Sequence, residues 1–162
     1  MIAGKTLYTA YGASLLAALL LQLVELPEVL AAARPMWLPL FLAYWALTEP
    51  RVSVLVGGFL LGLASDVLFG SVLGEHALAL VIVAYMVTRL RVIFALFPLW
   101  QATLALIPAW TLYAFTLFWI DGATQHQADP WLRWLPIVAT TLFWPLVYST
   151  LETLLGRREE EE

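Results

Sequence analysis

The residues best suited to chemistry in this chain are one acid and one histidine in an apolar region. Asp66 interrupts the stretch from Val52 to Ala77, which is apolar over a membrane-spanning length, and His76 follows ten residues later. An acid inside a membrane span costs about 2.5–3.5 kcal/mol at mid-depth on insertion scales, so it normally faces protein or water and has a partner. Asp66 is therefore a candidate polar site, and a hydrogen bond to His76 is one option for its partner.

The patterns of known catalytic and metal sites are absent from the sequence. The chain has no cysteine, which excludes thiolate chemistry. Its two histidines, His76 and His126, form neither an H-x-x-x-H nor an H-E-x-x-H pair, so a metal site is not expected. The sequence also lacks G-x-S-x-G, a Walker-type loop and G-x-G-x-x-G. We predict a protein that is not an enzyme and has no cofactor.

The composition is that of an integral membrane protein. Of the 162 residues, 62% are apolar and only 12% are charged, against about 25% charged in a soluble domain, and the mean hydropathy is +0.86. The net charge is −4, but the run 159–162 supplies four negative charges. The remainder is near neutral and offers no basic surface to nucleic acid. We predict one transmembrane helical domain over 1–156 and a charged cytoplasmic tail over 157–162.

Six apolar segments must position the candidate site, which predicts an all-α membrane protein with a six-span transmembrane helix bundle. Polar or proline-containing connections separate these segments, and 121–130 is the longest connection. The second segment is short for a bilayer core of about 30 Å, which takes about 20 residues. Five spans are the alternative if that segment does not cross. The expected segments are 7–24, 36–48, 52–70, 75–90, 100–120 and 132–155.

Lysine and arginine predict the orientation of the bundle, because cytoplasmic loops carry an excess of both. With six spans and the N-terminus inside, six of the eight cationic residues are cytoplasmic, and only Arg34 and Arg133 are outside. Five spans with the N-terminus outside give the same six-to-two division, so the count does not choose between them. Both versions place Arg89, Arg91 and the C-terminus inside. The strongly apolar second segment favours six spans.

Small or special residues at every fourth position of the third segment predict a close-packing seam. Four residues turn a helix by about 400°, so such positions form a slowly drifting stripe, and glycines in it let another helix approach closely. The seam serves helix packing or partner binding, and ordinary packing within the bundle is the structural alternative. Its residues are Gly58, Gly62, Asp66, Gly70 and Gly74.

Arg34 is the candidate for a second polar contact, near the outer face. It lies at the outer start of the second segment, and its long side chain can reach along the helix toward Asp66. Two classes of function remain from the residues alone. One is a helical scaffold that binds other membrane proteins through the seam, and the other is a small-solute membrane transport subunit with Asp66 as a polar contact.

These features together resemble the rod shape-determining protein MreD family of bacteria. The resemblance covers about 34–148 and implies a multi-pass protein of the bacterial inner membrane that serves the cell-elongation machinery without known enzymatic activity. Besides the glycine and Asp66 series, it rests on Arg34-Pro35-x-Trp37, Tyr44-Trp45, Ala84-Tyr85 and Phe143-Trp144-Pro145.

The resemblance also implies partners. MreC is the first expected partner, with the actin-like MreB, the RodA glycosyltransferase and its penicillin-binding partner in the same complex, and with self-association left open. The family bundle is similar to the substrate-binding subunits of vitamin transporters, which keeps the small-solute transport subunit as the alternative function.

Two introduced cysteines test the predicted orientation, because the natural chain contains none. With the 121–130 loop outside and the C-terminus inside, we expect a membrane-impermeant thiol reagent to label a cysteine at Gln125 in intact cells. A cysteine at Glu160 should react only after lysis. Labelling of position 160 but not of position 125 in intact cells would overturn the orientation.

Overall fold

The chain folds as a bundle of helices, and the described residues contain no strand. The structure is a computed structural model that describes residues 4–24, 27, 33–123 and 134–155. The predicted tail 157–162 and most of the 121–130 loop lie outside the described residues. The predicted all-α, multi-span class is confirmed. The helices are α1 Gly4–Leu23, α3 Trp37–Thr48, α4 Val54–Phe69, α5 Glu75–Phe94, α6 Leu99–Ala105, α7 Ile107–Ala123 and α8 Leu135–Leu154.

A proline explains why the fifth segment consists of two helices. The helix breaks at Leu106, between α6 and α7, two residues before Pro108. Proline has no N–H to donate and its ring clashes with the carbonyl four residues earlier, so a helix kinks or breaks there. Pro136, by contrast, lies in the first turn of α8, where a missing N–H costs no helical bond.

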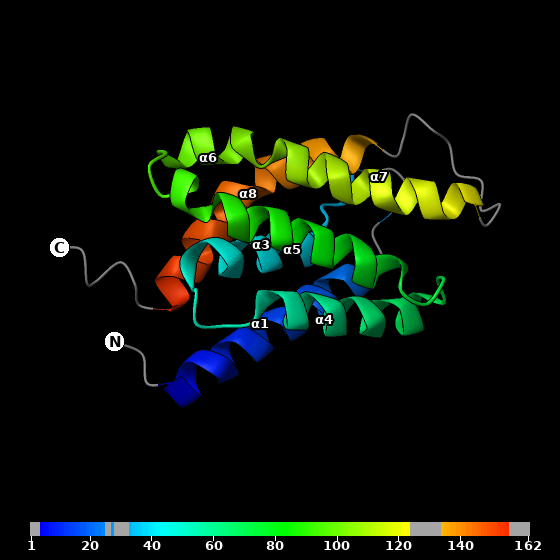
Figure 1. Ribbon diagram of the computed structural model, residues 1–162, viewed down its shortest axis with the longest axis horizontal. Coiled ribbons are helices and arrows are strands. Elements are labelled where there is room, and N and C mark those ends of the chain that lie inside the picture. The colour runs from blue at the N-terminus through cyan, green and yellow to red at the C-terminus, as the bar shows by residue number, and fades with distance from the viewer. Residues whose placement is uncertain (1–3, 25–26, 28–32, 124–133, 156–162) are drawn as a thin grey trace.

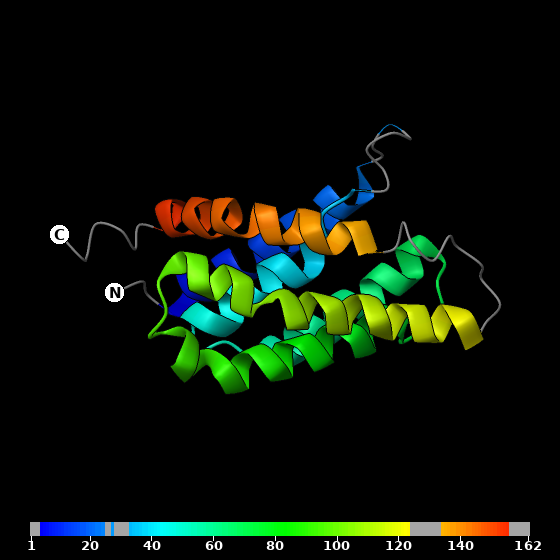
Figure 2. The same cartoon turned by 90° about the horizontal axis from the view of Figure 1, so that it is seen from above.

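The chain runs back and forth along the long axis of the bundle (Figure 1). The start of α1 and the end of α8 lie at one end of the molecule, together with the α3–α4 turn and the 95–98 turn. The α4–α5 turn lies at the opposite end, and Figure 2 shows the same alternation after a 90° rotation. With α6 and α7 counted as one segment, this is an even number of passes, which is the arrangement that the six-span prediction requires.

Length separates the six segments into two kinds. Two of them are short: α3 has 12 residues and α4 has 16, about 18 Å and 24 Å at 1.5 Å per residue. The hydrocarbon core of a bilayer is about 30 Å thick. The other four are long and apolar enough to cross a membrane: Thr6–Leu23, Glu75–Phe94, Leu99–Ala123 and Leu135–Leu154.

The short helix α3 lies inside the bundle. Nine consecutive residues, from Leu38 to Ala46, are buried, and α3 contacts α1, α4, α5 and α8. A helix that is apolar on every face is expected to be surrounded by protein. Because its neighbours supply its surroundings, α3 does not have to match the thickness of the bilayer. The short segment noted in the sequence is therefore placed against protein.

The polar turn predicted after this segment joins α3 to α4. Arg51 holds the buried Glu49 through Nε at 2.8 Å and Nη2 at 3.1 Å. These hydrogen bonds raise the pKa of the Arg51 guanidinium above its ordinary value. The Tyr8 hydroxyl of α1 donates to the carbonyl of Arg51 at 3.2 Å, so this turn is also tied to the first helix.

Two glycines allow α4 to pack closely in the bundle. A Cβ on Gly58 would lie 2.9 Å from Cδ2 of Leu42 in α3 and 3.6 Å from the carbonyl oxygen of Leu80 in α5. A Cβ on Gly62 would overlap backbone atoms of Ala77 and His76. Backbone cannot move aside as the end of a flexible side chain can, so Gly62 sets how near α4 and α5 approach each other.

Gly62→Ala tests this close approach with a single methyl group. We expect a loss of about 1–3 kcal/mol in the free energy of unfolding, the usual cost of overpacking, measured from denaturant transitions of the purified protein in detergent. Gly12→Ala in α1 is the matched control, because a Cβ there meets nothing within 4 Å. Equal stability of both variants would contradict the close packing at Gly62.

Candidate functional site

Four hydrogen-bond donors surround the Asp66 carboxylate in the described residues. Only 1% of Asp66 is exposed. Its Oδ1 accepts the Ser71 hydroxyl at 2.9 Å and the His76 backbone N–H at 2.9 Å. Its Oδ2 accepts the Gly74 N–H at 2.8 Å. The His76 ring nitrogen Nδ1 lies 2.9 Å from Oδ1 and donates to it when it carries the proton. We call this group, Asp66 with Ser71, Gly74 and His76, the Asp66 cap.

The Asp66 cap joins the end of one helix to the start of the next. Asp66 lies in the last turn of α4, and its donors lie in the α4–α5 turn and at the start of α5. The first N–H groups of a helix have no partner within the helix, and the helix dipole favours negative charge there. Asp66 supplies both an acceptor and a charge, so it caps α5 from a neighbouring helix.

Gly70 and Gly74 provide the backbone conformation of this turn, and they are not close-packing residues of the bundle. Gly70 has φ +65° and Gly74 has φ +99°, a region that only glycine adopts without strain. A Cβ on either would meet nothing within 4 Å. The packing seam predicted from the sequence is therefore limited to Gly58, Gly62 and Asp66. The repeat of four continues past Phe69, where α4 ends and helical spacing no longer aligns residues on one face.

Arg34 and Asp66 are not partners in the structure. Every hydrogen bond that the described residues give to the Asp66 side chain comes from Ser71, Gly74 or His76. Arg34 is partly buried, and its Nη2 atom is buried without a hydrogen-bond partner among the described residues. A buried donor without an acceptor costs about 1–3 kcal/mol, so the described part of the chain leaves the Nη2 atom of Arg34 without an acceptor that it requires. The contact between Asp66 and His76, the other option from the sequence, is present.

The geometry of the Asp66 cap does not support nucleophilic catalysis. In a Ser–His–Asp triad the serine and the acid contact opposite nitrogens of the histidine ring. Here Ser71 Oγ lies 3.3 Å from Nδ1, the same atom that faces Asp66. No group of three or more His, Asp or Glu side chains in the described part of the chain is placed to hold a metal ion. The cap can therefore hold two helices together, and this geometry gives it no chemical step.

Three acids near helix ends are covered by the bundle or bonded to it. Glu49 is 4% exposed and Glu75 is 5% exposed. Glu152 accepts the hydroxyl of Tyr44 at 3.0 Å, which links α8 to the central helix α3. Sequence position places these residues near helix ends, but only the tertiary packing decides whether a helix end is covered. A possible signal for Glu152 is its place within an apolar stretch, three residues after Ser149.

Two substitutions of Asp66 distinguish hydrogen bonding from charge. In Asp66→Asn the side-chain oxygen can replace Oδ1, which meets three of the four donors, so only the bond from Gly74 is lost. We expect a loss of about 1 kcal/mol in the free energy of unfolding. Asp66→Leu leaves the Gly74 and His76 N–H groups without an acceptor, at about 1–3 kcal/mol each.

The measurement is again denaturant unfolding in detergent, with helix content checked by circular dichroism. An equal loss in both variants would show that charge, and not the set of hydrogen bonds, is what matters at position 66. No loss in either would contradict the capping role.

Comparison with known proteins identifies the family. The family model described as rod shape-determining protein MreD matches residues 4–154. The rod shape-determining protein MreD of Haemophilus influenzae is 30% identical over 137 residues, which is 85% of this chain and 85% of that protein. No solved structure matches the chain. The match includes the central helix α3 and the whole of the Asp66 cap, and the chain therefore belongs to the rod shape-determining protein MreD family, with a role in cell shape.

Proposed function

We propose that the protein is a non-enzymatic scaffold subunit of the bacterial cell-elongation machinery in the inner membrane. In this role it couples MreC and MreB to peptidoglycan synthesis by RodA and its penicillin-binding partner. The observation that carries the proposal is the match to the rod shape-determining protein MreD family over residues 4–154. A scaffold needs a stable shape, and the Asp66 cap and the close contact at Gly62 provide one.

The proposed orientation puts the N- and C-termini in the cytoplasm. Three arginines support it, because Arg51 lies in the α3–α4 turn and Arg89 and Arg91 lie near the end of α5, at the end of the bundle that holds the start of α1 and the end of α8 (Figure 1). Arg34 precedes α3 at the opposite end. This distribution agrees with the excess of cationic residues on the cytoplasmic side of membrane proteins.

Arg34 is the residue we propose for contact with MreC. Its guanidinium has a nitrogen without an acceptor among the described residues, and a carboxylate of a partner chain would supply the charge-assisted hydrogen bonds that arginine forms best. In the proposed orientation this contact lies near the outer face of the membrane. Gly58, Gly62, Asp66, Gly70 and Gly74 would act indirectly, by fixing the shape of the α4–α5 hairpin.

The test uses a rod-shaped strain whose only copy of this gene is the variant. Arg34→Gln removes the charge and should reduce the recovery of MreC with the tagged protein at least fivefold, with rounded cells. Arg34→Lys keeps the charge but not the planar geometry and should be intermediate. Arg89→Gln is the control, because Arg89 contacts only Tyr85 of its own helix among the described residues, through an Nε–Oη distance of 3.3 Å and the face of the ring.

Two results would contradict separate parts of this proposal. Normal rods and normal MreC recovery with Arg34→Gln would remove Arg34 from the interface but leave the scaffold function in place. Normal rods in cells that lack the protein altogether would contradict the function itself. Immunoblots of the membrane fraction establish that each variant is present at the level of the natural protein.

A further inference from the structure

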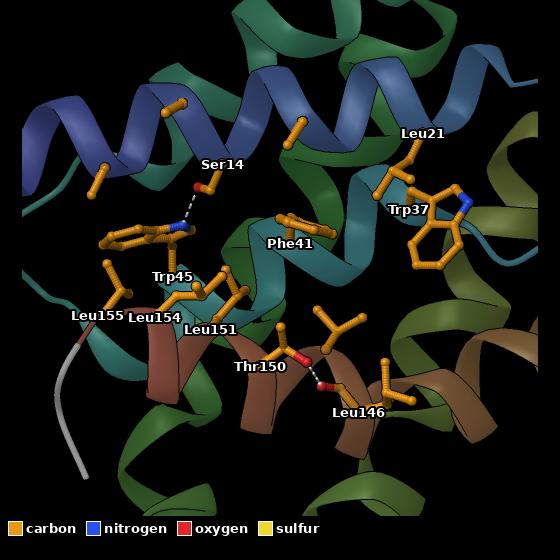
Figure 3. Close-up of a pocket in the computed structure, with 14 residues that line it drawn as sticks. Ser14, Leu21, Trp37, Phe41, Trp45, Leu146, Thr150, Leu151, Leu154 and Leu155 are labelled. Carbon is orange, nitrogen blue, oxygen red and sulfur yellow. Dashed lines mark hydrogen bonds between the residues drawn. The ribbon is translucent and has the colours of Figure 1, made fainter. Parts of the chain in front are cut away.

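An apolar groove runs between α1 and α8, and the central helix α3 forms its floor (Figure 3). Its volume is about 470 Å³. Alanines line the α1 wall, aromatic rings line the floor and branched apolar side chains line the α8 wall. The residues that define it best are Ala13, Ala17, Trp37, Phe41, Val147 and Leu151.

The side-chain hydroxyls of the groove and the indole N–H of Trp45 already have hydrogen-bond partners within the protein. The Ser14 hydroxyl donates to the carbonyl of Tyr11 at 2.8 Å and accepts the indole N–H of Trp45 at 2.7 Å. The Thr150 hydroxyl donates to the carbonyl of Leu146 at 2.6 Å. A polar ligand would lose its hydrogen bonds to water and regain few of them, at a cost of about 1–3 kcal/mol for each group left without a partner. The chemistry of the groove therefore selects hydrocarbon.

The dimensions match one acyl chain. An apolar protein cavity of about 150 Å³ stays dry and binds benzene, which has six carbons, so 470 Å³ scales to roughly eighteen carbons. Along α1 the groove extends from Ala10 to Leu21, about 17 Å at 1.5 Å per residue. That is close to half of the 30 Å hydrocarbon core, or about the depth that one lipid leaflet fills.

A transmembrane helix fits this space less well. A helix with its side chains is about 10 Å wide, so a 17 Å length occupies roughly 1,300 Å³, nearly three times the volume of the groove. The walls of the groove belong to α1 and α8, which are both long and apolar enough to span a membrane. Helices of this kind lie among lipid acyl chains, so lipid is the hydrocarbon that we expect to reach the groove.

We infer that the groove is a binding site for one acyl chain of a membrane phospholipid. The chain lies between α1 and α8 and rests on Phe41, so that it fills the space that the alanines of α1 leave open. Both walls pack on α3, and the bound chain completes the packing between them. The site is separate from the Asp66 cap and from Arg34, and it does not depend on the proposed role in cell elongation.

Native mass spectrometry of the purified protein in a mild detergent tests this inference. We expect the natural protein to retain one phospholipid per chain. The double substitution Ala13→Leu and Ala17→Leu fills the groove and should lower this retention at least fivefold. Ala64→Leu is the matched control, because Ala64 is exposed on α4 and does not line the groove. Circular dichroism checks that each variant is folded.

A second measurement remains valid if the double variant does not fold. The natural protein is placed in phosphatidylethanolamine–phosphatidylglycerol vesicles that contain a lipid with a photoreactive acyl chain, and the labelled peptides are mapped. We expect labelling of Phe41 and Val147, which lie inside the groove, in competition with unlabelled lipid. Lipid retained equally by the natural and filled proteins, or no lipid retained by the natural protein, would overturn the site.

Photolabelling confined to the exposed outer faces of the helices would also overturn the acyl-chain site. A photoreactive residue at Ala17 in living cells provides the last check. If it forms adducts with another membrane protein and none with lipid, the groove is an interface for a transmembrane helix, and the acyl-chain site is wrong.

Discussion

The requirement that a buried carboxylate be fully hydrogen-bonded determines the geometry of the α4–α5 hairpin. Asp66 is almost completely covered by protein, and an ionised group in such a place is tolerated only when its oxygens have donors. Those donors come from the first residues of α5 and from the turn before it, so the hairpin can close in only one register. Gly70 and Gly74 bend the backbone to allow this closure, and Gly62 lets the two helices meet without a gap.

The rest of the bundle is arranged around the short helix α3. Its rings connect two of the long helices: Trp45 contacts Tyr11 of α1 at a centroid distance of 5.2 Å, and Tyr44 contacts Tyr148 of α8 at 5.6 Å. On another side, Leu42 lies against the position of Gly58 in α4. A helix of 12 residues can occupy the centre of a membrane protein because neighbouring helices cover most of its surface. The same enclosure leaves α1 and α8 separated by the groove.

Much of this fold was predictable from the sequence. The apolar runs predicted the six segments, although α3 and α4 are shorter than the roughly 20 residues that cross a bilayer. Trp45, Trp110 and Trp144 lie within their segments, and all three are fully buried in the bundle. Gly58 and Gly62 were placed on the packed face by helical spacing alone, and the contact of Asp66 with His76 was one of the options.

The sequence did not predict the features that depend on where a helix ends and which residues cover that end. The repeat of four residues included Gly70 and Gly74, because spacing does not reveal the change to positive φ. Arg34 was predicted to contact Asp66 because both lie near the outer face of the membrane. In the structure, donors close to Asp66 in the sequence form its hydrogen bonds instead. The buried Glu75 and the groove both depend on packing between distant segments, for which a single sequence contains no local signal.

The nearness in sequence of the four donors to Asp66 has a consequence for biogenesis. They lie five to ten residues after the acid, so every partner of the carboxylate emerges from the ribosome shortly after Asp66 itself. On its own, α4 is shorter than the hydrocarbon core of the bilayer, and it would carry a carboxylate without hydrogen-bond donors into it. Together with the start of α5 it presents a carboxylate that is already bonded, so the two helices form a single unit for the insertion machinery.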